Sequence, residues 1–258
     1  MTKKAAMNNF RHILTTLLLV TGVVCAKGEG IFDNLTYYGR LGYSLGGTAP
    51  IGMPETIRSL SKYTVKANIT IGLDAYKPLG GKWGIMGGFH IETKGMGTDA
   101  RVKNYSMEMR QGNESLKGVF TGQVVSNVEA RMVTLPLQAA YDVSGKVRLK
   151  LGPYFSYLLS NKFDGYAYDG YLRVGNPTGE KVEMGTDKGS RGNYDFSDYM
   201  RKWQFGVDVG ADWYFSRHFG AYLDMSWGLS GVFKQNFKTI EQTLYPIYGT
   251  IGITYKLN

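Results

Sequence analysis

The chain has 258 residues, of which 20 % are charged, and its formal net charge is +9 at pH 7. The basic residues are scattered among carboxylates and form no block, which argues against a nucleic-acid partner. A single cysteine, Cys25, leaves no intrachain disulfide and no cysteine-based metal site to consider.

Residues 1–26 have the pattern of a signal peptide. Three basic side chains precede an apolar stretch at 13–24, and Val24-Cys25-Ala26 offers small residues for cleavage. The apolar stretch is shorter than the ~20 residues that a helix needs to cross a bilayer. A rival interpretation makes Cys25 a lipidated residue, but Val24 is bulkier than such a site prefers. We expect a mature chain that begins at or near Lys27, with 27 basic and 21 acidic residues and a net charge of +6.

Residues 27–258 form one expected domain with eight strands. From Thr36 onward, apolar and polar residues alternate in eight segments, and the connectors between them are alternately long and short. The long, polar connectors cover 48–62, 95–127, 161–197 and 231–243, and the short ones cover 78–82, 142–146 and 216–218. Outer-membrane barrels have this asymmetry, with short periplasmic turns and long outer loops. The sequence therefore predicts an all-β, eight-stranded antiparallel up-and-down transmembrane barrel in the cell outer membrane.

The segment at 64–77 shows the alternation most clearly. Its apolar residues include Ile69, Ile71 and Leu73, and polar residues such as Thr70 and Asp74 stand between them. In a membrane barrel the apolar set faces lipid and the polar set fills the interior. Segments at 82–94, 203–215 and 247–257 repeat the pattern.

Aromatic residues gather on the lipid-facing side next to the short turns. These residues are Tyr37, Trp83, Tyr141, Trp213, Phe219 and Tyr255. Six strands thus supply an aromatic side chain at one height, which is typical of the girdle at a membrane–water interface.

Charged residues dominate the opposite, inward face. The cations expected there are Arg40, Lys66, Lys94, Arg131, Arg148, Lys150 and Lys256, and the anions are Asp74, Glu92, Glu129, Asp208, Asp212 and Asp224. Side chains just fill the interior of an eight-stranded barrel, and charges inside it must be paired or hydrated. We therefore expect a plugged barrel with an internal network of ion pairs.

Two prolines interrupt the expected strands. Pro136 and Pro153 each remove a ladder hydrogen bond in a barrel that has no free edge, so we expect bulges there. A bulge is also required if Glu129 and Arg131 face inward while Tyr141 faces outward.

The segments around these prolines carry a resemblance to a known family. The stretches TLPLQAAY at 134–141, LGPYFSYLL at 151–159 and FGVDVG at 205–210 resemble the PorT-like outer-membrane β-barrel family. The end, T-x-G-x-x-Y-x-L at 250–257, resembles the signal read by the barrel-insertion machinery, but it closes on Leu257-Asn258 instead of a terminal Phe. The resemblance implies a barrel without catalytic residues; some members are tied to protein secretion, and many have no assigned role.

An enzymatic alternative depends on His90. His90 and Glu92 lie two residues apart on the expected inward face, where a carboxylate could orient a histidine base. No serine is placed beside them by the sequence, and no spacing of His and carboxylates indicates a metal site. We expect no enzyme, no cofactor and no metal. A small porin-like channel and, less favoured, an outer-membrane hydrolase using His90 are the alternatives.

The outer loops are the expected place of function. Loops as long as 95–127 and 161–197 on a rigid scaffold usually carry function, and the second contains Tyr166, Tyr168, Tyr171 and Tyr194. Tyrosine offers contact area at a low entropy cost. The expected partners are outer-membrane lipid, the barrel-insertion machinery and, at the loops, a protein or a glycan; the alternative is that the loops fold over the barrel mouth. Each loop should be replaceable by a short turn, because the barrel sets the strand register.

Overall fold

The computed structural model describes residues 33–52, 54–111, 114–237, 239–240 and 242–257. The expected signal peptide at 1–26 and the expected mature start at Lys27 lie outside the described residues. The elements are β1 (Thr36–Pro50), β2 (Ile57–Val65), β3 (Ile69–Gly80), β4 (Trp83–Gln111), β5 (Glu114–Ser144), β6 (Val147–Val174), β7 (Lys181–Met184), β8 (Gly192–Asp195), η1 (Ser197–Tyr199), β9 (Trp203–Tyr214), β10 (Phe219–Gly228) and β11 (Leu244–Lys256). None of the described helices is long and apolar enough to cross a membrane.

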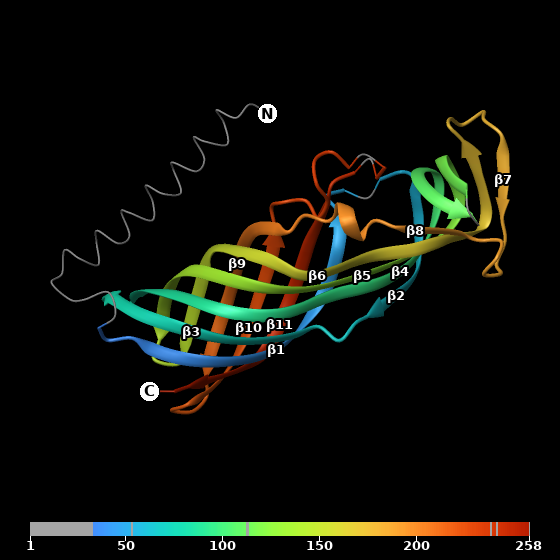
Figure 1. Cartoon of the computed structure of the whole chain (residues 1–258). Coiled ribbons are helices and arrows are strands. Elements are labelled where there is room, and N and C mark those ends of the chain that lie inside the picture. The colour runs from blue at the N-terminus through green and yellow to red at the C-terminus, as the bar shows by residue number, and fades with distance from the viewer. Residues whose placement is uncertain (1–32, 53, 112–113, 238, 241, 258) are drawn as a thin grey trace, which may run out of the picture.

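Eight of the strands close into a barrel (Figure 1). The ring runs β1–β3–β4–β5–β6–β9–β10–β11, each strand is antiparallel to its neighbours, and β11 pairs with β1 to complete it. The predicted eight-stranded up-and-down barrel is therefore confirmed. All three predicted short turns are also present, between β3 and β4, between β5 and β6, and between β9 and β10.

The long connectors at 95–127 and 161–197 are not the loops that the sequence suggested, whereas no strand lies between β10 and β11 in the described residues of 231–243. β4 and β5 continue as a paired hairpin from Gly95 opposite Glu129 to Gln111 opposite Glu114, and β6 runs on to Val174. Figure 1 shows these three strands leaving the barrel together, with β7 at their far end and β8 nearer the barrel, where it pairs with residues 164–167 of β6. We call this part the extension: residues 95–127 of β4 and β5 and residues 161–200. The expected strand at 64–77 is also divided, because β2 ends at Val65, pairs only with β4, and is followed by β3 from Ile69.

The predicted facing of the barrel strands is confirmed on β3. Thr70 and Asp74 are buried in the interior, whereas Ile71 and Leu73 are exposed on the outside. Such an apolar outer surface would be unusually large for a protein in water, and it matches the lipid-facing band of a membrane barrel.

Aromatic side chains border this apolar surface at both ends. At the short-turn end, Trp83 lies opposite Tyr141 with ring centroids 4.8 Å apart, and Phe219 lies opposite Tyr255 at 4.9 Å. The other predicted members, Tyr37 and Trp213, are exposed as well.

A second girdle, which the sequence analysis did not identify, borders the end nearer the extension. It includes Tyr43, Tyr157, Trp203 and Trp227, and the rings of Tyr157 and Trp203 are 4.7 Å apart. On β9, Trp213 lies ten positions after Trp203. At ~3.3 Å per residue and a tilt of ~40°, they span about 25 Å along the barrel axis, which is the height of a lipid-facing band.

The expected bulges at the prolines are wrong, and so is the inward facing of Glu129 and Arg131. On β5 the even-numbered residues from Val128 to Ala140 are buried, Pro136 among them, whereas Glu129 and Arg131 are exposed. The pairing keeps one register across Pro136 in both ladders. Each proline leaves a gap in the hydrogen bonds without inserting a residue, so strict alternation persists. The register shift that does occur lies farther along, where Arg131 and Met132 face Ser160 and Leu158, which leaves Leu159 as an extra residue on β6.

The depth of the apolar band can be tested on β6. Leu151 and Leu159 are both 56 % exposed on the outside, but Leu151 lies midway between the girdles and Leu159 lies beyond Tyr157. Leu151→Arg should lower the free energy of unfolding by about 2–4 kcal/mol, and Leu159→Arg by about 0–1 kcal/mol, because the penalty for arginine falls toward the interface. Urea unfolding in lipid vesicles, followed by tryptophan fluorescence, measures both. Equal losses would mean that the band does not span the hydrocarbon layer.

Candidate functional site

An ion-pair network crosses the interior of the barrel. The guanidinium of Arg40 on β1 contacts Asp74 on β3, Asp212 on β9 at 2.9 Å and Asp224 on β10 at 3.8 Å. Lys150 on β6 approaches the same two carboxylates of β9 and β10, at 2.9 Å and 2.8 Å. Five strands from opposite sides of the ring therefore meet at one cluster, as the inward charges predicted.

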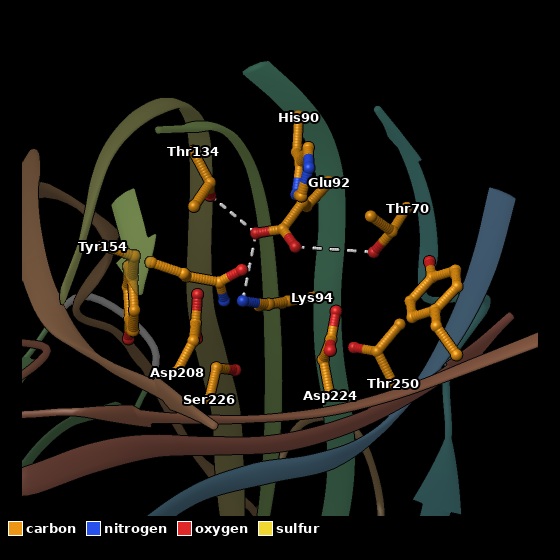
Figure 2. Close-up of a pocket in the computed structure, with 12 residues that line it drawn as sticks. Thr70, His90, Glu92, Lys94, Thr134, Tyr154, Asp208, Asp224, Ser226 and Thr250 are labelled. Carbon is orange, nitrogen blue, oxygen red and sulfur yellow. Dashed lines mark hydrogen bonds and ion pairs between the residues drawn. The ribbon is translucent and has the colours of Figure 1, made fainter. Parts of the chain in front are cut away.

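A second polar group lies beside this network and lines a small cavity of about 30 Å³ (Figure 2). Glu92 lies 3.0 Å from the Nζ atom of Lys94 and accepts hydrogen bonds from Thr134 at 2.6 Å and Thr70 at 3.5 Å. Asp208 lines the same cavity. The carboxylate of Glu92 on β4 thus contacts Lys94 on its own strand and the hydroxyl groups of both adjacent strands, β3 and β5.

Arg148 closes the interior at the short-turn end. Its Nε atom donates to Asp142 at 2.7 Å, and its guanidinium carbon lies 3.5 Å from the ring centroid of Tyr76. Tyr38 and Tyr214 flank it at 5.6 Å. A cation stacked on aromatic faces is stabilised by the ring quadrupoles.

The remaining predicted inward charges have other positions. Glu129 and Arg131 lie outside, where Glu129 pairs with Lys66 at 3.3 Å. Lys256 is half-buried. The predicted interior set is therefore correct for the residues between the girdles and wrong for those at the edge of the extension.

His90 has a different partner from the one that the sequence suggested. Its Nε2 atom lies 2.7 Å from Asp74 on β3, so the ring joins the Arg40 network and is not oriented by Glu92. Within the described residues, no serine or threonine hydroxyl contacts the His90 ring, and no three His, Cys, Asp or Glu side chains gather as metal ligands. The arrangement pairs charges and presents no nucleophile to a base.

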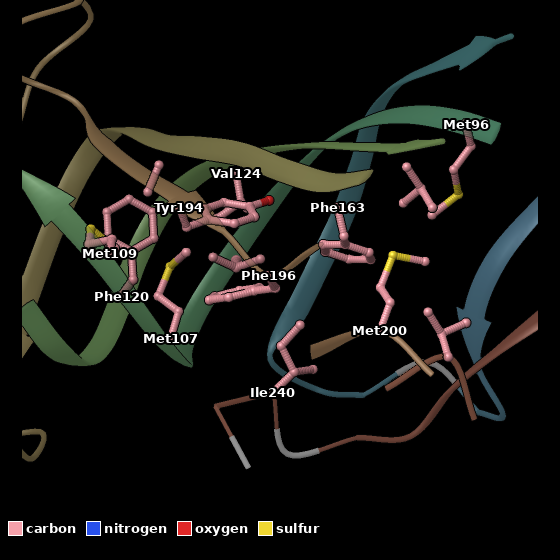
Figure 3. Packing of buried hydrophobic residues seen from close by; sticks show 14 of the residues in the cluster. Met96, Met107, Met109, Phe120, Val124, Phe163, Tyr194, Phe196, Met200 and Ile240 are labelled. Carbon is pink, nitrogen blue, oxygen red and sulfur yellow. The ribbon is translucent and has the colours of Figure 1, made fainter. Parts of the chain in front are cut away.

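The extension has an apolar core of its own, which the sequence analysis missed (Figure 3). Met107 and Phe120, from β4 and β5, pack with Phe163 of β6, with Phe196 between β8 and η1, and with Ile240. The core continues into the mouth of the barrel through Met96, Met132, Leu158 and Met200. The sequence signal for it was the period of two that continues on β5, where Phe120, Val124 and Val128 are buried in phase with the barrel.

β8 closes a second ring beyond the barrel. Asn193 of β8 pairs with Tyr166 on β6 and with Arg110 on β4, so β4, β5, β6 and β8 surround the core. Gly192 packs closely at this closure, because the sulfur of Met109 would have to shift to admit a Cβ atom there. The extension is thus a packed body and not a set of free loops.

The four tyrosines expected in the second long connector divide between core and surface. Burial raises the pKa of Tyr194 above its usual range, and its neutral hydroxyl donates to the carbonyl of Val125 at 2.8 Å. Tyr168 donates to Asp99 at 2.8 Å, and this hydrogen bond, with a smaller effect of desolvation, raises its pKa to about 12. Tyr166 and Tyr171 lie nearer the surface.

The interior network can be tested by removing one carboxylate. Asp212→Ala should lower the free energy of unfolding by about 3–5 kcal/mol, because it leaves Arg40 and Lys150 short of a buried counter-charge. Glu129→Ala removes an exposed ion pair and should cost about 0–1 kcal/mol. Urea titration of both variants in lipid vesicles decides the matter. Equal losses would indicate a water-filled interior in which the cations are hydrated.

A family model agrees with this architecture. The family model described as "outer membrane protein beta-barrel domain" matches residues 32–234. Among solved structures, the attachment invasion locus protein Ail of Yersinia pestis is 12 % identical with a TM-score of 0.39, and it aligns over 86 % of this chain and 97 % of its own. OprG of Pseudomonas aeruginosa is 14 % identical with a TM-score of 0.35, over 86 % of this chain and 96 % of its own.

No match was found among curated proteins. The two solved structures are too distant to transfer any property, since unrelated functions share small barrels. The family model, however, covers most of the described chain. The protein therefore belongs to the outer membrane protein beta-barrel domain family, and its place is the outer membrane.

Proposed function

We propose that this protein is a non-enzymatic outer-membrane barrel with a plugged interior, which holds the extension at the cell surface as a binding module. The observation that carries the proposal is the meeting of Arg40 and Lys150 with carboxylates from three other strands inside the ring. A sidedness follows from the connectors, because short turns of such barrels lie in the periplasm and long ones lie outside.

Two further features support the plug. The cavity beside Glu92 is about 30 Å³, which is room for about one water molecule. On the side of this cavity that faces the extension, the mouth of the barrel is filled by buried apolar side chains, namely Met96, Met132, Leu158 and Met200. Charged side chains between the girdles and apolar ones at the mouth thus fill the axis along which a solute would have to pass.

The absence of catalysis is part of the proposal. The chemistry of a hydrolase would need His90 beside a nucleophile, and its described contact is with Asp74. The finer assignment to PorT-like barrels is supported by the stretches at 134–141 and 151–159. Contacts with outer-membrane lipid and with the barrel-insertion machinery follow from the proposed location.

The plug predicts poor conductance. The purified chain, inserted in planar bilayers, should give no large, steady single-channel currents, because no continuous water column can form beside the ion pairs. A porin measured in the same bilayers provides the positive control. Large steady currents from the intact chain would favour a small channel instead.

The extension should respond to deletion as one unit. Replacing 99–124 alone by a short Gly/Ser turn removes Phe120 and exposes Leu172 and Phe196 to water, so the variant should aggregate and give less folded monomer. Replacing both 99–124 and 165–195 should give more folded barrel than either single replacement. Unboiled gel electrophoresis and sedimentation measure the folded fraction. If each single replacement folds like the intact chain, the two connectors are independent loops after all.

A further inference from the structure

An open groove of about 650 Å³ lies on the extension, apart from the interior network. Its walls come from β4, β5, β6, β8, η1 and the segment after β10, and they include Tyr166, Arg191, Asn193, Tyr199 and Phe237. Continuous strands of the barrel hold several of these walls, so the groove exists without a partner to form it.

One side of the groove is aromatic. Tyr199 is 46 % exposed, and its ring centroid lies 4.8 Å from that of Phe237, which in turn lies 5.0 Å from Phe196. The groove is also lined by Tyr166, and the guanidinium carbon of Arg191 lies 3.9 Å from the centroid of its ring. The aromatic rings thus offer flat apolar surface to a ligand, next to a fixed hydrogen-bond donor.

Two residues that line the groove also carry buried polar atoms without a partner. Among the described residues, neither Oδ1 of Asp164 nor Nε of Arg191 has a hydrogen-bond partner; the other oxygen of Asp164 is paired with Lys162 at 3.0 Å. A buried polar atom without a partner costs about 1–3 kcal/mol. The unpaired acceptor and the unpaired donor belong to two residues that line one groove, which favours a ligand that supplies a donor and an acceptor together.

We propose that this groove binds a neutral sugar residue of an oligosaccharide. A sugar hydroxyl both donates and accepts, which suits the unpaired acceptor of Asp164, the unpaired donor of Arg191 and the amide of Asn193. The C–H face of a sugar ring is apolar and packs on an aromatic ring such as Tyr199. The inference rests on the proposed function, since it requires the extension to face the outside.

The charges of the groove narrow the class of ligand. Of the described residues that line it, Glu108, Asp164, Asp195 and Asp198 are acidic and Arg191 is basic, so an anionic polysaccharide is disfavoured. A basic peptide would match the carboxylates, but its cation would meet Arg191, which already occupies the face of Tyr166. The neutral sugar satisfies both unpaired atoms without bringing a charge into contact with a like charge.

Binding by the full folded chain in detergent micelles tests the inference. The probes are neutral hexasaccharides of glucose, mannose, xylose and N-acetylglucosamine, measured by saturation-transfer NMR and titration calorimetry. At least one should bind, and Tyr199→Ala and Asp164→Ala should each weaken it at least tenfold. Tyr171→Ala is the matched control, because Tyr171 lies on β6 outside the groove, against Lys181, and it should leave the affinity unchanged.

Three outcomes would overturn the inference: no binding of any hexasaccharide, equal binding by all variants, or binding of hexalysine alone with loss in Tyr199→Ala. The last would identify a site for basic peptides. Bilayer recordings on the same preparation separate this inference from the proposed function. A chain that conducts no ions and binds no sugar remains a plugged barrel, whereas a conducting chain that binds sugar would contradict only the plug.

Discussion

The hydrocarbon layer of a membrane offers no water to satisfy a backbone N–H or C=O group, and closure of the strand ring is the response on which the rest of this structure depends. The pairing of β11 with β1 removes the last open edge. Once the backbone is satisfied, the period of two sends Ile71 to lipid and Thr70 inward. Eight strands enclose little space, so the inward charges contact one another, and Arg40 meets carboxylates from three strands.

The medium outside the strands decides whether polar or apolar side chains face inward. On β5 the inward side chains change from polar in the barrel to apolar in the extension. Between the girdles its inward residues include Gln138 and Thr134, and Leu135 is exposed. Farther along, Val128 and Phe120 are buried, whereas Glu129 is exposed. In lipid the polar set must turn inward, and in water the apolar set must. The same strand therefore builds a polar barrel interior and an apolar extension core. The exposed charges of Glu129 and Arg131, where β5 passes from one to the other, mark the edge of the membrane.

The strand count, the facing of the barrel residues and the aromatic girdle at the short-turn end could be predicted from the sequence, because each depends on a local period. Glu129 and Arg131 were misplaced because Pro136 was expected to insert a bulge, whereas a gap in the ladder is enough. The core of the extension was hidden because the phase of alternation changes along β4 and β6, where Asn104 and Asp169 have positive φ beside two register shifts. A count of alternating residues cannot follow a pattern across such shifts.

The candidate groove required the three-dimensional register. His90 reaches Asp74 only because Gly72 lies opposite it on β3, and Arg191 reaches Tyr166 only because β8 returns to pair with β6. The return of β8 also gives the groove its stiffness, since β4, β5 and β6 continue without a break from the barrel into the extension. A ligand that binds to preformed walls loses less free energy to ordering the protein than one that must fold a loop. A barrel whose strands are linked by interior ion pairs is a rigid foundation for such walls, because β4, β5 and β6 run through both parts.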